Sequence, residues 1–394
     1  MMHSEAPFRG GAILGGKENM KIGRVAARLL RIPVPMKGPG INKTVPRQLL
    51  LAEIETERGP VGYGITGLVS SRAVCDLINN TVAPMIVGMD AREISRVWDA
   101  MYREFGHRGQ TGLAYHAISA IDIALWDIKG KALGEPIWRL LGGARDRVPC
   151  YVTCGVSSLD TEQLAAVAKD WVAKGFGGVK LVVGVIARDR AADFPNVIAA
   201  LREDARRVKA VREAVGDDID IAIDINCELD PMQARELARL CAPYDLAFIE
   251  EPVLDNHPGR MADFRKHCGC PVAAGQSLGG LARFGELLVQ GAVDMLQPNV
   301  INCGGYTGGL RAADHALAFA TPICNGGGST VHNLHLQAGV VNGTVCEWHP
   351  YQSAGAMAVL CPDAPKPDKG WLAAPEGPGL GFDPDPDLIK EFAA

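Results

Sequence analysis

From residue 148 onward, short apolar runs alternate with amphipathic stretches in units of about 25–30 residues, and this repeat limits the possible folds most. The apolar runs predict strands, and the stretches between them predict helices. Repeated strand–helix units imply a parallel sheet, and seven or eight of them in about 210 residues favour a closed barrel over an open sheet. The predicted strands are Val148–Cys154, Gly178–Val183, Ile219–Asp224, Leu246–Glu250, Val272–Ala274, Met295–Gln297 and Pro322–Cys324.

The N-terminal third has a different pattern. Residues 115–131 carry apolar side chains at helical spacing, and the glycine- and proline-rich residues 35–44 predict a surface loop. Residues 1–19 show no periodicity and predict a flexible leader. Three alternating runs predict strands, the last two joined as a hairpin: Val25–Pro35, Gln48–Thr56 and Val61–Ile65. Strands followed by helices indicate an α+β domain.

Polar side chains stand where three predicted barrel strands end. Asp224, Glu250 and Gln276 are 26 residues apart, one repeat each, so we expect them to converge above the barrel. Oxygen ligands in such a cluster suit Mg²⁺. The alternative is that these side chains cap helices and form salt bridges.

Composition excludes several classes of protein. Forty basic and 45 acidic residues leave a net charge of −5, so no general attraction to nucleic acid is expected. The mean hydropathy is +0.06, and no apolar run approaches the roughly 20 residues that a membrane span needs. Eleven cysteines, an odd number, without a secretory signal favour a reducing, cytoplasmic location.

Several stretches together resemble the mandelate racemase/muconate lactonizing enzyme group of the enolase superfamily. They are Ala117–Gly130 with Leu140–Gly143, Asp224–Asn226, Ile249–Pro252 and Asn302–Gly308. The resemblance implies a modified TIM barrel, (β/α)7β, with an α+β capping domain. It places the capping domain at residues 20–145, the barrel at 146–364, and a C-terminal segment that returns to the capping domain at 365–394. Family members are commonly homo-oligomers.

The resemblance also implies a chemistry. Family members use Mg²⁺ on three strand-end acids to stabilise the enediolate formed when a base removes the proton α to a carboxylate. Asp224 and Glu250 match two of these ligands, and Gln276 stands at the third position. Lys180 and Glu347 match catalytic positions. Two capping-domain loops, at Lys37–Lys43 and His107-Arg108, would close over the substrate. The substrate-binding positions would be Lys43, Thr153, Asn226, Asn299 and Asn325.

Three catalytic positions depart from the family pattern. Val182 replaces the second lysine of the Lys-x-Lys motif, Asn299 replaces an aspartate, and Gly327 lies in the triple glycine where a histidine is usual. Racemisation needs an acid–base group on each face of the carbon, so this pattern argues against a two-base racemase. Lys180 could act as a single base if burial lowers its pKa, or it could act electrostatically.

Two readings of the function remain open. The first is a Mg²⁺-dependent dehydratase acting on a hydroxy-carboxylate or sugar acid, with epimerase, racemase or cycloisomerase action as a variant of it. The second is a catalytically impaired homologue that binds a small carboxylate. Cys154 or Cys324 could supply an acid–base group, although buried thiols are usually inert. His335 is expected to serve packing.

Overall fold

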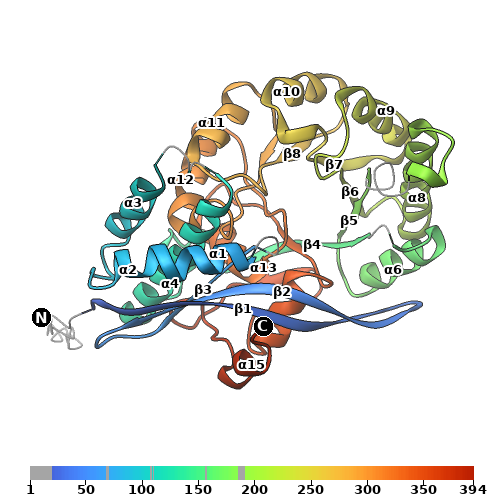
Figure 1. Ribbon diagram of the computed structural model, residues 1–394. Helices are drawn as coiled ribbons and strands as arrows, with labels where there is room; N and C mark the ends of the chain where they lie inside the picture. Colours follow the sequence, from blue (N-terminus) through green and yellow to red (C-terminus); the bar gives the residue numbers. More distant parts are fainter. Residues whose placement is uncertain (1–19, 68–70, 107–108, 110, 156–157, 185–190) are drawn as a thin grey trace, which may run out of the picture.

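The computed structural model describes residues 20–67, 71–106, 109, 111–155, 158–184 and 191–394. The predicted leader and the predicted closing loop at His107-Arg108 therefore lie outside the described residues. Figure 1 shows two parts, a curved parallel sheet surrounded by helices and a smaller antiparallel sheet with its own helices.

The capping domain begins with a three-stranded antiparallel sheet. Strand β1 (Ile22–Gly38) pairs with β2 (Ile41–Thr56), and β2 pairs with β3 (Gly62–Thr66). The helices that follow are α1 (Ser71–Leu77), α2 (Ala83–Ile86), α3 (Ile94–Phe105), α4 (Leu113–Leu133) and α5 (Ile137–Leu140). Helix α4 lies directly on β3, because a Cβ atom at Gly62 would come within 2.6 Å of Ile128 Cγ1. Small side chains on the facing side of α4 and the glycines of β3 thus allow close contact between helix and sheet.

The prediction of a loop over residues 35–44 was wrong. These residues form the end of the β1–β2 hairpin, and the ladder continues through Pro35 opposite Thr44 and Lys37 opposite Asn42. Figure 1 shows this long hairpin running along one side of the barrel. The apolar alternation of β1 extends to Val34 and Met36, which are buried, and prolines are tolerated in an edge strand.

The barrel strands are parallel and pair in the order β10-β4-β5-β6-β7-β8-β9. Ile323 bridges Leu296 on one side and Gly343 on the other, so single bridges complete the ring and Pro322–Cys324 is not a full strand. The strands are β4 (Arg147–Gly155), β5 (Gly178–Val182), β6 (Asp220–Asp224), β7 (Leu246–Glu250), β8 (Val272–Ala274), β9 (Met295–Leu296) and β10 (Cys346–Trp348).

The barrel helices lie outside the strands (Figure 1). They are α6 (Thr161–Ala173), α8 (Val197–Val215), α9 (Pro231–Cys241), α10 (Pro258–His267), α11 (Leu281–Val289), α12 (Gly305–Ala318) and α13 (Thr330–Gly339). Asp160 and Asp230 accept hydrogen bonds from the first-turn N–H groups of α6 and α9, which sets where these helices begin. Over the described residues, no helix is both long enough and apolar enough to cross a bilayer.

The C-terminal segment contacts both parts of the molecule. After α14 (Ser353–Leu360), strand β11 (Trp371–Ala373) pairs antiparallel with β4 of the barrel. Beyond it, Leu380 N donates to Asp127 of α4, and helix α15 (Pro386–Glu391) leads to a bridge between Ala393 and Leu30 of β1. The return to the capping domain therefore follows β11.

Gly305 lies where α4 closely approaches the start of α12, and we expect Gly305→Ala to be destabilising. Gly305 has φ +74°, and its Cβ atom would lie 2.6 Å from Asp122 Cγ. Asp122 accepts a hydrogen bond from Thr307 N at 2.9 Å, so its displacement would uncap α12. Strain and overpacking together should lower the free energy of unfolding by about 2–3 kcal/mol, measured by urea denaturation.

The matched control for this variant is Gly88→Ala. Gly88 also has a positive φ, +87°, but an added Cβ would meet nothing within 4 Å. It should therefore show only the cost of backbone strain, roughly 1 kcal/mol. Equal losses in the two variants would contradict the proposed contact with Asp122.

Candidate active site

The carboxyl ends of four barrel strands bring three acids around one amine. Lys180 of β5 has its Nζ atom 2.7 Å from Glu250 Oε2, 2.9 Å from Glu347 Oε1 and 3.3 Å from Asp224 Oδ2. All four side chains are buried, and Lys180 is only 1% exposed. Parallel strands end at the same edge of a barrel, which is why residues up to 167 positions apart in the chain meet here.

Hydrogen bonds hold Glu347 in this cluster. The Thr153 hydroxyl of β4 donates to Glu347 Oε1, and Gly328 N donates to Oε2 at 2.6 Å. Burial alone would raise the pKa of Glu347. The charge of Lys180, together with His349 and the Thr153 hydrogen bond, outweighs burial, so the pKa of Glu347 is lowered. The environment of Glu347 therefore favours the carboxylate over the carboxylic acid.

The same charges decide the state of Lys180. Burial by itself lowers the pKa of the amine, but the charges of Glu250 and Glu347 outweigh burial and raise that pKa well above its usual value. A protonated amine cannot accept a proton at neutral pH, so Lys180 is poorly suited as a base. Its charge makes it suited to binding or stabilising an anion.

Negative charge exceeds positive charge in the cluster. Burial, followed by the charge of Asp224, raises the pKa of Glu250 well above its usual value and also raises that of Glu251. Glu250 Oε1 is buried without a hydrogen-bond partner among the described residues. An oxygen left unpaired among several carboxylates fits a bound cation.

Gln276 contacts the acids through its nitrogen. Its Nε2 donates to Glu251 Oε2 at 2.9 Å and lies 3.5 Å from Asp224 Oδ2. Within the residues that the structure describes, no three His, Cys, Asp or Glu side chains are arranged to hold a metal ion. Turning the amide about its last side-chain bond would exchange the two atoms and present the oxygen to Asp224.

The predicted substrate-binding residues have different surroundings. Asn299 and Asn325 each donate to Gly326 O at 3.0 Å, and Asn325 Oδ1 also accepts from Glu347 N at 3.2 Å. Their amides thus hold the glycine loop in place. Asn226 is exposed, and its backbone N–H donates to Asp224 Oδ1 at 2.9 Å. Lys43 is exposed on β2 opposite Met36, and no hydrogen bond or ion pair of the described residues joins it to the cluster.

The surroundings of the other acid–base candidates from the sequence do not favour proton transfer. Burial raises the pKa of the Cys154 thiol to about 12 and raises that of Cys324 as well. His335 accepts from Trp138 N at 3.2 Å through Nδ1 and lies 3.1 Å from Leu380 O through Nε2, so both of its nitrogens are used in packing.

Three functional candidates were missed from the sequence. Neighbouring residues of a strand normally face opposite sides, yet Glu251 has φ +45°, which allows its carboxylate to join that of Glu250. Gln297 follows β9 and is fully buried, with neither amide atom paired among the described residues; its position at a predicted strand end was a usable signal. His349 follows β10, two residues after Glu347.

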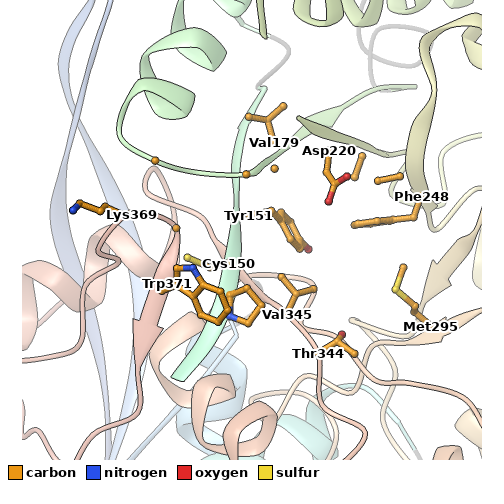
Figure 2. Close-up of a pocket in the computed structure, with 17 residues that line it drawn as sticks. Cys150, Tyr151, Val179, Asp220, Phe248, Met295, Thr344, Val345, Lys369 and Trp371 are labelled. Atoms are coloured by element: carbon orange, nitrogen blue, oxygen red, sulfur yellow. The ribbon is translucent and has the colours of Figure 1, made fainter. Parts of the chain in front are cut away.

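A cavity of about 600 Å³ lies at the opposite end of the barrel from this cluster. Figure 2 shows its apolar lining, which includes Tyr151, Phe248 and Met295. The Tyr151 ring lies between the two regions. Lys180 Nζ is 5.6 Å from the centroid of this ring, and the Tyr151 hydroxyl donates to Asn325 O at 2.9 Å. The cavity is therefore not part of the candidate active site.

Both parts of the chain match known families. Residues 25–142 match the mandelate racemase/muconate lactonizing enzyme N-terminal domain, and residues 163–388 match the enolase C-terminal domain-like family. The chain belongs to the mandelate racemase/muconate lactonizing enzyme family.

Characterised relatives in this family carry out different reactions. The arabinonate dehydratase of Saccharolobus solfataricus is 30% identical over 88% of this chain and 91% of its own length. The 3,6-anhydro-α-L-galactonate cycloisomerase of Streptomyces coelicolor is 32% identical over 94% and 99%. A racemase from Streptomyces coelicolor, solved with bound magnesium, is 30% identical with a TM-score of 0.84 and covers 95% of this chain and 100% of its own.

Proposed function

We propose that this protein is a Mg²⁺-dependent dehydratase that acts on a sugar acid or related hydroxy-carboxylate. The observation that carries the proposal is the buried amine of Lys180, held 2.7–3.3 Å from three strand-end carboxylates. The similarity to a dehydratase of arabinonate supports the substrate class and the reaction.

The metal site would be formed by Asp224, Glu250 and Gln276. The unpaired Glu250 Oε1 and the surplus of carboxylates support this assignment, and Gln276 would contribute its amide oxygen after the side-chain rotation described above. When bound, the ion would act as a Lewis acid that stabilises negative charge on the substrate carboxylate.

Lys180 would stabilise the same developing charge from the protein side. Its ammonium is held in place by Glu250 and Glu347, and Thr153 and Gly328 position Glu347 in turn. A preorganised charge of this kind lowers the barrier because it does not have to reorient during the reaction.

The direct test is incubation of the purified protein with MgCl₂ and a library of sugar acids in D₂O. We expect a 2-keto acid to form from at least one aldonate, detected with semicarbazide, and NMR to show loss of the α-proton signal. No product and no exchange across the library would reject the proposal.

A second candidate function is binding of a small carboxylate without turnover. Val182 and the triple glycine at 326–328 favour it, because acid–base side chains are missing there. Saturable binding of a sugar acid, measured by calorimetry without α-exchange in D₂O, would support this alternative.

Restoring a carboxylate with Gln276→Glu should increase the dependence on Mg²⁺. Without the ion, the variant loses the Nε2 hydrogen bonds and adds a charge beside Glu251 and Asp224, which should cost about 1–3 kcal/mol of unfolding free energy. When Mg²⁺ is present, the three acids of the variant should bind the ion more tightly than the wild-type site does. The increase in unfolding free energy on adding Mg²⁺ should therefore be larger in the variant.

Thermal unfolding with and without MgCl₂ measures both effects. The control is Gln290→Glu, which adds the same charge at an exposed position at the end of α11. If Gln276→Glu matches wild type without Mg²⁺ and gains no additional stabilisation from it, Gln276 does not border a cation site.

A further inference from the structure

The proposed reaction needs a group that accepts the α-proton, and the expected positions offer none. Val182 is apolar, the Lys180 amine is paired with three carboxylates within 3.3 Å, and residues 326–328 have no side chains. Removal of an α-proton by general-base catalysis requires a side chain with a free acceptor atom close to the substrate carbon.

His349 lies at the right place to fill this gap. His349 comes directly after Trp348, the last residue of β10, and two residues after Glu347. A Cβ atom built on Gly328 would lie 3.6 Å from His349 Cβ. The last strand therefore brings a histidine next to the loop where a seventh-strand side chain is missing.

The imidazole has an acceptor atom that nothing in the described residues uses. Nδ1 of His349 is buried and has no hydrogen-bond partner there. The residue as a whole is half-buried, and its exposed surface belongs to atoms other than Nδ1. By contrast, both nitrogens of His335 have partners in the protein.

The charged groups facing His349 come from three strands. They are Glu347 of β10, Lys180 of β5 and Arg47 of β2. Burial lowers the pKa of His349 to about 4, and the two cations act in the same direction against the opposing charge of Glu347. The imidazole is therefore neutral near pH 7, which is the form that can accept a proton.

We propose that His349 is the general base of this enzyme, and this inference rests on the dehydratase function proposed above. The α-proton moves to a ring nitrogen of the neutral imidazole, and the C–H electron pair forms the enediolate that Lys180 stabilises. Collapse of the enediolate breaks the C–O bond at the β-carbon, and the proton on His349 joins the departing hydroxide as water. The enol product then becomes a 2-keto acid, and no oxidant or reductant is needed.

The test compares His349→Asn with wild type on the sugar acid that wild type converts in the library assay. We expect kcat to fall about 10²- to 10⁴-fold, with loss of α-exchange in D₂O and little change in KM. The control is His267→Asn, an exposed histidine at the end of α10, which should keep wild-type rates.

Chemical rescue separates catalysis from a structural role. In His349→Gly, added imidazole should restore part of kcat in proportion to its free-base concentration, while wild type should not respond. Two results would overturn the role of His349 and leave the dehydratase proposal intact. One is a His349→Asn variant that is as active as an active wild type, and the other is the absence of rescue in a folded His349→Gly protein. A wild type that converts no sugar acid would overturn both.

Discussion

Replacing Lys180 with methionine should reduce the proposed dehydration about 10²- to 10³-fold in kcat, because the charge that stabilises the enediolate is lost. The same change leaves Glu250, Glu347 and Asp224 buried without their shared cation. Removing one partner of a buried ion pair costs about 3–5 kcal/mol, so we also expect a large loss of unfolding free energy at pH 8.

The loss of stability should depend on pH in a defined direction. The pKa of Lys180 is raised in the folded state, so its stabilising contribution is complete below the unfolded value and is lost only in strong alkali. The pKa of Glu250 is also raised, and its protonation as the pH falls should relieve the variant. The difference from wild type should therefore shrink from pH 8 to pH 5.

Urea denaturation at the two pH values measures this difference. Lys174→Met is the matched control, because Lys174 forms an exposed pair with Asp170 on the surface, 2.7 Å apart. Such surface pairs contribute about 0–1 kcal/mol. A Lys180→Met protein as stable and as active as Lys174→Met would contradict the central role of the Lys180 amine.

Reintroducing a histidine on the seventh-strand side with Gly326→His should damage the site instead of restoring a second base. A Cβ atom at Gly326 would lie 2.6 Å from Gln297 Nε2 and 2.9 Å from Glu250 Oε1. The histidine could fit only if Gln297 and the Glu250 carboxylate shifted, which would disturb the pair of Glu250 with Lys180. Overpacking combined with a broken ion pair should cost about 3–5 kcal/mol and abolish detectable turnover.

Thermal unfolding and the 2-keto acid assay test this variant. Gly177→His is the control, because a Cβ atom at Gly177 would meet nothing within 4 Å. Racemisation of a substrate by Gly326→His, with wild-type stability, would show that the loop can accommodate a side chain and would contradict the packing described here.

The regular parts of the fold were predictable because their patterns are local. The strand predictions at Leu246–Glu250 and Val272–Ala274 match β7 and β8 residue for residue. Helix α6 begins at Thr161, directly after Asp160, whose side chain caps its first turn, which is also a local signal. Pro322–Cys324 was over-predicted, because only Ile323 pairs with its neighbours.

The hairpin shows where local composition misled. Glycine and proline at 35–44 suggested a loop, but edge strands tolerate proline, and the buried alternation ending at Met36 was the more informative pattern. Consequently Lys43 lies on an exposed strand and not on a loop over the site.

The sequence alone determined the repeat of strands and helices and the positions of Asp224, Glu250 and Gln276 at strand ends, because these follow from periodicity along the chain. Tertiary structure decided the chemistry of the cluster. Lys180 is held protonated only because three carboxylates from other strands surround it, Gln276 presents nitrogen because two acids face it, and His349 becomes a candidate base because the glycine loop leaves room beside it. Protonation and access depend on neighbours that are distant in sequence, which no local pattern records.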